Sequence, residues 1–249
     1  MKPPETPSLF GELWPEPDRQ AAPPNAAPRR AGRVGTAAEA GRLGALASAL
    51  PAALRLGTSS WSFPGWNGLV YDHAASESAL ARDGLAAYAR HPLFRTVGVD
   101  KTFYRPAPRA EFERLAAQVP DGFGFLVKVW RGIVERDPHG AASPAAFLDA
   151  RVAVTDCIAP ALEGLGGKAG PILFQFTPMR LSGASSARAF IAELGAFLGR
   201  LPRGALYAVE VRNAALVGPE LGETLAERGA VPCLTVHPTM PDLEIQSRE

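Results

Sequence analysis

Two charged residues stand two positions apart in a short apolar stretch, LYAVEVR, that ends at Arg212. Side chains two positions apart in a β-strand point to the same face, so Glu210 and Arg212 are predicted to share the inner face of a sheet. A carboxylate beside a cation stays ionised and acts as a general base only if a substrate displaces its partner. This spacing predicts an acid/base role for Glu210 and an anion-binding role for Arg212, with a structural salt bridge as the alternative.

A lysine interrupts another apolar stretch, GFGFLVKV, at position 128. Burying an unpaired ammonium group is costly, so Lys128 must pair with a carboxylate or lose its charge. Glu210 is the predicted partner, either of Lys128 or of Arg212. Lys128 is therefore a candidate acid/base or substrate-binding residue, and a purely structural ion pair is the other interpretation.

Polar and aromatic residues near the ends of other apolar stretches complete the candidate site. His237 ends PCLTVH and is a candidate acid or base, because histidine changes its charge near neutral pH. The Gln175 amide can bind a substrate hydroxyl or carbonyl group, or satisfy another protein group. The Tyr104 phenol is expected at the mouth of the site, with its ring packed on Trp61. The candidate substrate-binding residues are Arg212, Gln175, Tyr104, Asp100, Thr58, Ser59, Trp61 and Trp66.

The stretch LGTSSWSFPGWNGLVY, residues 56–71, has the composition of a strand end that opens into a structured loop. Trp61 and Trp66 could stack on a sugar or a base, or form a hydrophobic lid that holds the loop down. Thr58 and Ser59 offer hydroxyl groups, but no G-x-S-x-G motif surrounds them, which argues against an activated serine nucleophile.

Metal and nucleotide motifs are missing from the sequence. Its four histidines are scattered, so we predict no metal site. Neither G-x-G-x-x-G nor G-x-x-x-x-G-K-[ST] follows a predicted strand, which argues against an open nucleotide-binding sheet and leaves the cofactor unknown. The 26 Lys and Arg residues nearly balance the 25 Asp and Glu residues, which argues against nucleic acid and membrane partners.

Short apolar stretches alternate with amphipathic ones along most of the chain. Strands are predicted over residues 55–59, 95–104, 122–129, 171–176, 206–212 and 232–237, and helices over 36–50, 78–90, 108–118, 144–165, 182–201 and 219–228. Such alternation predicts a parallel sheet covered by helices. The polar residues that end the strands favour a (β/α) barrel, whose sites lie at the carboxyl ends of the strands.

The first part of the chain differs from the rest in composition. Residues 1–35 are rich in proline, alanine and arginine, which is typical of a disordered arm. We therefore predict a disordered arm with a short helix over residues 1–54 and one α/β domain over residues 55–249. The absence of a signal-peptide pattern and of a long apolar run, together with two cysteines expected to be reduced, predicts a cytoplasmic protein.

Five motifs in order, GTSSWSFPGWNG, TVGVDKTFYRP, FGFLVKV, GPILFQFTP and YAVEVRN, resemble the DUF72 (YecE-like) family over about residues 55–240. The resemblance implies a TIM-barrel fold and an activity that is not established. The second motif departs from the family pattern V-E-[IV]-N-[SG]-T-F-Y, because Gly98 stands in place of the glutamate and Asp100 and Lys101 replace Asn and Ser. The role of that glutamate is therefore not transferred to this chain.

An eight-stranded barrel needs two more βα units after His237, so we expect a barrel that is truncated after its sixth strand. Three classes of function stay open. The first is an enzyme acting by acid/base chemistry on a small polar or phosphorylated substrate at the mouth of the barrel. The others are a nucleic-acid-processing barrel, which the near-neutral charge disfavours, and a non-catalytic binding protein or truncated remnant.

Overall fold

The computed structural model describes residues 34–136 and 146–248, which belong to one compact unit, Val34–Glu249. Residues 1–33 of the predicted disordered arm lie outside the described part. Residues 34–49 pack with the rest of the unit: the Val34 side chain is buried, and the Ala37 backbone N–H donates to Val70 O at 2.9 Å. The compact unit thus begins at Val34, whereas the predicted division lies after residue 54.

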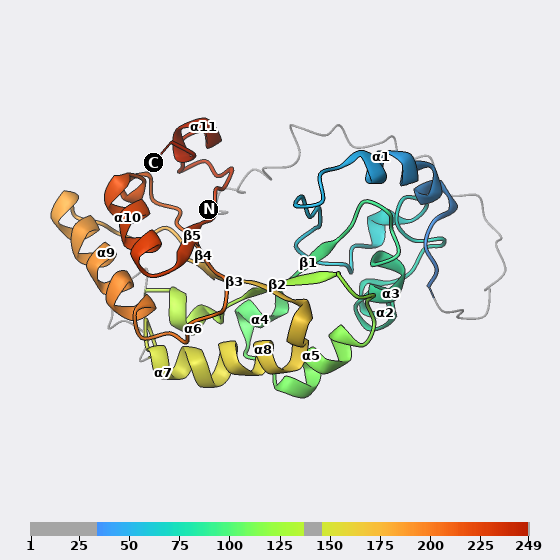
Figure 1. The fold of residues 1–249 in the computed structure, drawn as a ribbon, viewed down its shortest axis with the longest axis horizontal. Helices are drawn as coiled ribbons and strands as arrows, with labels where there is room; N and C mark the ends of the chain where they lie inside the picture. Colours follow the sequence, from blue (N-terminus) through green and yellow to red (C-terminus); the bar gives the residue numbers. More distant parts are fainter. Residues whose placement is uncertain (1–33, 137–145, 249) are drawn as a thin grey trace, which may run out of the picture. The chain divides into compact units, whose positions relative to one another are not determined.

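Five parallel strands form one sheet in the order β1-β2-β3-β4-β5 (Figure 1). Their bounds are β1 Thr96–Val99, β2 Gly124–Lys128, β3 Ala169–Gln175, β4 Tyr207–Glu210 and β5 Ala230–Pro232. Each strand pairs with its neighbour in sequence, as βα units do when they follow one another around a curved sheet. The fold is therefore α/β, with a parallel sheet and helices.

The two outermost predicted strands differ from what the structure shows. Residues 55–59 contribute a single bridge, between Leu56 and Phe94, although Gly98 N also donates to Thr58 O at 2.8 Å beside β1. At the other edge the strand ends at Pro232, so the predicted strand over residues 232–237 is wrong. Proline has no backbone N–H, which limits pairing on its side of an edge strand.

The predicted strand over residues 95–104 is too long, because β1 ends at Val99.

The helices follow the predicted alternation. The predicted helix over residues 36–50 is formed by η1 (Ala38–Leu43) and α1 (Gly44–Ala49), and the one over 78–90 is divided at Gly84 into α2 (Glu77–Asp83) and α3 (Leu85–Tyr88). The remaining α-helices are α4 Lys101–Tyr104, α5 Arg109–Ala116, α6 Arg131–Val134, α7 Ala150–Val152, α8 Ala159–Leu165, α9 Ala184–Leu198, α10 Pro219–Glu227 and α11 Leu243–Gln246. A π-helical segment, η3 (Ala153–Ile158), joins α7 to α8, and short 3-10 segments are η2 (Pro64–Trp66), η4 (Gly166–Lys168) and η5 (Ala214–Leu216).

The two faces of the sheet differ in chemistry. One face packs its apolar side chains into a continuous core with the helices, and Figure 1 shows α5 and α8 along one side of strands β1–β3. This face carries Val97, Val99, Phe125, Val127, Ile172, Phe174, Tyr207 and Val209. The alternate positions form the opposite side, which we call the inner face. It carries Gly98, Leu126, Lys128, Leu173, Gln175, Ala208 and Glu210.

Among the helices in the described residues, none has both the length and the apolar character that crossing a bilayer requires.

Candidate functional site

Asp100 and Lys128 form an ion pair at the carboxyl ends of β1 and β2. Lys128 is the last residue of β2, and Asp100 follows β1 directly and precedes the first turn of α4. Because Val99 pairs with Val127, the next residues along each strand lie side by side. Lys128 Nζ lies 3.0 Å from Asp100 Oδ1, with side chains that are 17% and 33% exposed. The predicted pairing of Lys128 with a carboxylate is confirmed, and its partner is Asp100.

Thr102 fixes the backbone around this pair. Its hydroxyl lies 2.6 Å from Val99 O and 2.7 Å from Lys128 O, and the side chain is buried. These contacts hold the start of α4 against the end of β2. No sequence pattern predicts this role, because a threonine two residues after Asp100 reaches β2 only when the strand ends at Val99 and the chain turns into a helix.

Glu210 is the centre of a second polar group, on β3 and β4. Gln175 Nε2 donates to Glu210 Oε2 at 2.6 Å, and Arg212 Nε donates to Glu210 Oε1 at 2.8 Å. The Glu210 side chain is only 6% exposed, whereas that of Arg212 is 28% exposed. The predicted pairing of Glu210 with Arg212 is confirmed. Both carboxylate oxygens of this buried residue therefore accept a hydrogen bond, which a charged group in the interior requires.

Cys233, one of the two cysteines that the sequence predicts to be reduced, lies next to these charges and is half-buried. Its backbone N–H donates to Val209 O at 2.8 Å, which places Cys233 beside Glu210 in the register. Burial raises the pKa of the thiol, the negative charge of Glu210 raises it further, and Lys128 and Arg212 act in the opposite direction. The thiol therefore lies within electrostatic range of both polar groups. Finding it requires the β4–β5 register, which the sequence does not give.

His237 lies beyond the end of β5, and the Thr239 side chain links it to the backbone of Arg212 by hydrogen bonds. Its Nδ1 is 2.8 Å from Thr239 Oγ1, and Thr239 Oγ1 donates to Arg212 O at 2.7 Å. The structure thus brings His237 close to the chain that follows β4, and its part in catalysis stays a prediction.

The predicted position of Tyr104 is wrong. Because β1 ends at Val99, Tyr104 lies in α4, where its side chain is 69% exposed and its ring packs edge-on against Phe103 at 5.5 Å between centroids. The group over the Trp61 ring is instead Lys101 Nζ, 5.8 Å from the centroid.

The two tryptophans of the 56–71 loop differ in burial. Trp61 is 5% exposed, its Nε1 donates to Ala81 O at 3.3 Å, and its carbonyl accepts from the Tyr71 hydroxyl. Trp66 is half-buried, with its ring 6.2 Å from that of Tyr88. Trp61 therefore packs into the core, as expected if this loop is held down by apolar packing.

Thr58 and Ser59 lie beside β1 rather than in the polar groups. Thr58 Oγ1 donates to Ser60 O at 2.6 Å and lies 2.8 Å from Tyr88 Oη, while Ser59 is exposed. Gly98 permits this close approach, because a Cβ there would lie 2.7 Å from Ser59 O. A glutamate at position 98, as in the family pattern, would require the Ser59 backbone to move.

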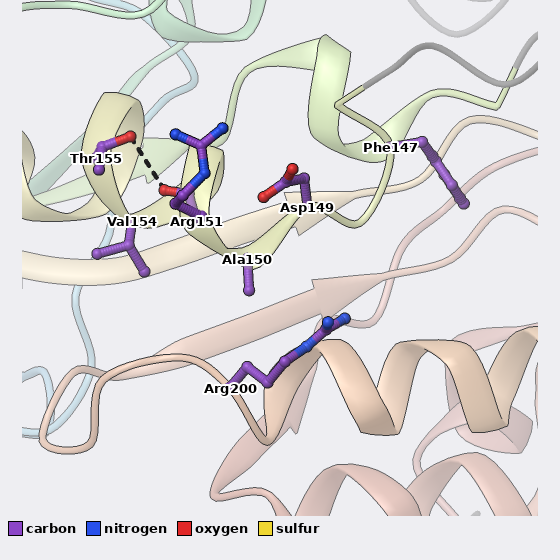
Figure 2. Close-up of a pocket in the computed structure, with 7 residues that line it drawn as sticks. All are labelled: Phe147, Asp149, Ala150, Arg151, Val154, Thr155 and Arg200. Atoms are coloured by element: carbon purple, nitrogen blue, oxygen red, sulfur yellow. Dashed lines mark hydrogen bonds between the residues drawn. The ribbon is translucent and has the colours of Figure 1, made fainter.

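A large hollow lies elsewhere in the fold. It has a volume of about 640 Å³ and is formed by α7, η3 and Arg200 after α9 (Figure 2). Figure 2 shows Arg151, Asp149 and Arg200 among its lining residues, and none of the residues drawn there belongs to the inner face. A smaller hollow of about 310 Å³ includes Thr58 and Trp66 and is mainly apolar. We place the candidate site on the inner face because the paired charges lie there.

Within the described residues, no three His, Cys, Asp or Glu side chains are grouped so that they could hold a metal ion.

Comparisons with solved structures find proteins of one family. A DUF72 family protein from Enterococcus faecalis V583 matches in two structures, with 19% and 20% identity and TM-scores of 0.48 and 0.49. These matches cover 72% and 76% of this chain and 60% and 66% of the other. A DUF72 family protein from Thermotoga maritima MSB8 matches with 22% identity and a TM-score of 0.49, covering 74% of this chain and 65% of the other. This chain thus spans less than two thirds of each of them.

A search of curated proteins finds no match. The model of a family described as "Protein of unknown function DUF72" matches residues 55–248, which is most of the chain. The chain belongs to the DUF72 family.

Proposed function

We propose that this chain is an enzyme that uses acid/base chemistry on a small polar or phosphorylated molecule at the carboxyl ends of its strands. The observation that carries the proposal is the pairing of two cations with two carboxylates on the inner face: Lys128 with Asp100, and Arg212 with Glu210. Active sites in parallel α/β folds are commonly built from charged side chains at the carboxyl ends of the strands.

The anion-binding part of the proposal rests on Arg212. Its Nε is used by Glu210, and in the described part of the chain its two terminal nitrogens donate to no acceptor. A guanidinium anchored on one side presents its other N–H groups in a fixed plane, which matches the oxygens of a phosphate or carboxylate. Arg212 is half-buried, so an anion bound there would be partly shielded from water.

Glu210, the buried partner of Arg212, also supports anion binding by Arg212. Glu210 orients Arg212 and is itself held by Gln175. Gln175 therefore acts through Glu210 rather than as a substrate-binding group, while the proposed acid/base residues are Glu210, Lys128 and His237. Asp100 and the 56–71 loop, with Thr58, Ser59, Trp61 and Trp66, would border the substrate.

We further infer that the sheet is of the TIM-barrel type and that the protein works in the cytoplasm. Support for the first comes from five parallel strands that each neighbour the next in sequence. Support for the second comes from Cys157 and Cys233, which are both free thiols, as expected in a reducing compartment.

The test is a thermal-shift screen with inorganic phosphate, glycerol 3-phosphate and a panel of phosphorylated sugars and acids. A ligand present at 100 times its Kd stabilises the folded state by about 2.7 kcal/mol. We expect at least one phosphorylated compound to raise the melting temperature of the wild type and not that of Arg212→Gln. Arg151→Gln, a change at an exposed arginine of the large hollow, is the matched control and should respond as the wild type does. No shift with any compound, or an equal shift in Arg212→Gln, would overturn the proposal.

A further inference from the structure

We propose that Asp100 and Lys128 together remove a proton from a carbon next to a carbonyl group, with Asp100 as the base and Lys128 stabilising the charge that develops on the carbonyl oxygen. The inference rests on the proposed function, because Arg212 is the group that would hold the anionic end of the same substrate. It moves the role of base from Glu210 to Asp100.

The hydrogen bonds of the two carboxylates separate their roles. Both oxygens of Glu210 accept side-chain donors within 2.8 Å, and the side chain is nearly enclosed. Asp100 has its enclosed Oδ1 3.0 Å from Lys128 Nζ, whereas no described residue donates a hydrogen bond to its Oδ2, and the side chain is 33% exposed. A base must lie within hydrogen-bond reach of the proton that it takes, so the carboxylate with free acceptor capacity is the better candidate.

The separation of the two groups suits this reaction. In a carbonyl compound, the acidic carbon and the carbonyl oxygen are separated by a single carbon atom. A base and an electrophile that act on them together must therefore be close neighbours. Lys128 Nζ and Asp100 Oδ1 are 3.0 Å apart, and adjacent strand ends hold the two backbones side by side. Thr102, which contacts both Val99 O and Lys128 O, keeps that spacing.

The step balances without an oxidant or reductant. The Asp100 carboxylate takes the proton from the carbon, the C–H electron pair forms a carbon–carbon double bond, and the carbonyl electron pair moves to oxygen. The Lys128 ammonium stabilises the resulting enolate by a charge-assisted hydrogen bond. Return of the proton from Asp100 to the same carbon regenerates the carbonyl compound and the starting carboxylate.

The substrate class follows from the three groups. Arg212 selects a carboxylate or phosphate, Lys128 a carbonyl oxygen, and Asp100 an acidic C–H bond beside it. Small 2-oxo acids and phosphorylated ketones or aldehydes carry all three features.

Proton removal can be followed without knowing the natural substrate. The full chain would be incubated in D₂O with pyruvate, 2-oxobutyrate, dihydroxyacetone phosphate or glyceraldehyde 3-phosphate, and the loss of the C–H signal beside the carbonyl followed by ¹H NMR. We expect the wild type to accelerate exchange for at least one probe. Asp100→Asn should lower that rate at least 100-fold while the thermal shift caused by the same probe is kept, and Lys128→Met should lower it at least tenfold.

Controls separate this inference from the proposed function and from misfolding. Asp100→Glu keeps the carboxylate and should recover part of the rate, whereas Arg151→Gln should exchange as the wild type does. If probes bind the wild type but no C–H signal is lost faster than in buffer, or if Asp100→Asn exchanges at the wild-type rate, the inference is wrong while the proposed function stands. If none of these probes and no compound of the thermal-shift panel binds, the proposed function fails and the inference fails with it.

Discussion

Gln175 Nε2 donates to Glu210 Oε2 over 2.6 Å, from one strand to the next across the inner face. The contact joins residues that are directly paired in the β3–β4 register, so the sheet itself sets their distance. The other oxygen of Glu210 accepts from Arg212 Nε, so the sheet also orients the Arg212 guanidinium, whose terminal nitrogens donate to none of the described residues.

Replacing Gln175 by leucine should destabilise the fold. The change leaves one oxygen of a buried carboxylate without its donor, which typically costs about 1–3 kcal/mol. The free energy of unfolding in urea would measure it. Gln118→Leu removes an amide that bonds only Arg114 O at the surface, and its cost should stay below about 0.5 kcal/mol. Equal losses in the two variants would contradict the buried network.

Gly98→Ala should cost stability because a Cβ at this position meets the Ser59 backbone. The Cβ would lie 2.7 Å from Ser59 O and 3.1 Å from Ser59 Cα, so the 56–60 segment would have to shift. Forced shifts of this kind typically cost about 1–3 kcal/mol. Gly41→Ala is the control, since a Cβ there has no neighbour within 4 Å. If Gly98→Ala unfolds at the same urea concentration as the wild type, the 56–60 segment must lie further from β1 than the structure shows.

The side-chain amide of Gln246 holds the segment that follows β5 by hydrogen bonds to its backbone. Its Oε1 accepts from Thr235 N at 3.1 Å, and its Nε2 donates to Thr235 O at 2.8 Å and to Pro241 O at 2.6 Å. Gln246→Ala should therefore speed hydrogen exchange at the Thr235 amide at least tenfold, because that N–H loses its acceptor. Exchange at the Val127 amide, inside the sheet, serves as the internal control. An unchanged Thr235 rate would contradict the contact.

Glu111 makes stability depend on pH. Burial by itself would raise the pKa of this carboxyl group, but the hydrogen bond and charge of Lys101, at 2.6 Å, and the charge of Arg105 bring the pKa below its ordinary value. A carboxyl group with a lowered pKa in the folded state stabilises the fold above its unfolded-state pKa, and that contribution is lost as pH falls through the folded-state pKa. Glu111→Gln should thus cost about 1–2 kcal/mol at pH 7. The difference from the wild type should shrink toward pH 3 in urea unfolding measured at both pH values, and a gap that stays constant with pH would disprove the ion-pair origin.

The sequence predicted the middle of the fold better than its edges. Strands β2, β3 and β4 lie where apolar runs such as PILFQF predict them, because buried strands need continuous apolar sequence. The edges depend on other residues: Pro232 ends β5, and the chain turns into α4 after Val99 although DKTFY has apolar and aromatic character. Local pattern does not encode these endings, since tertiary contacts such as that of Thr102 with Lys128 O decide them.

The candidate site was predictable in its residue types and less so in its pairing. Alternation in LYAVEVR correctly placed Glu210 beside Arg212. The partner of Lys128 depends on register, which sets Asp100 rather than Glu210 beside it. Tyr104 was misplaced for the same reason that β1 was drawn too long.

The central claim, that Arg212 on the inner face binds an anionic ligand, is tested most directly by isothermal titration of the compound with the largest thermal shift. We predict a Kd at least tenfold weaker for Arg212→Gln than for the wild type, which corresponds to about 1.4 kcal/mol, and an unchanged Kd for Arg151→Gln. The same Kd in wild type and Arg212→Gln, or a weaker one only in Arg151→Gln, would contradict the account and direct attention to the large hollow instead.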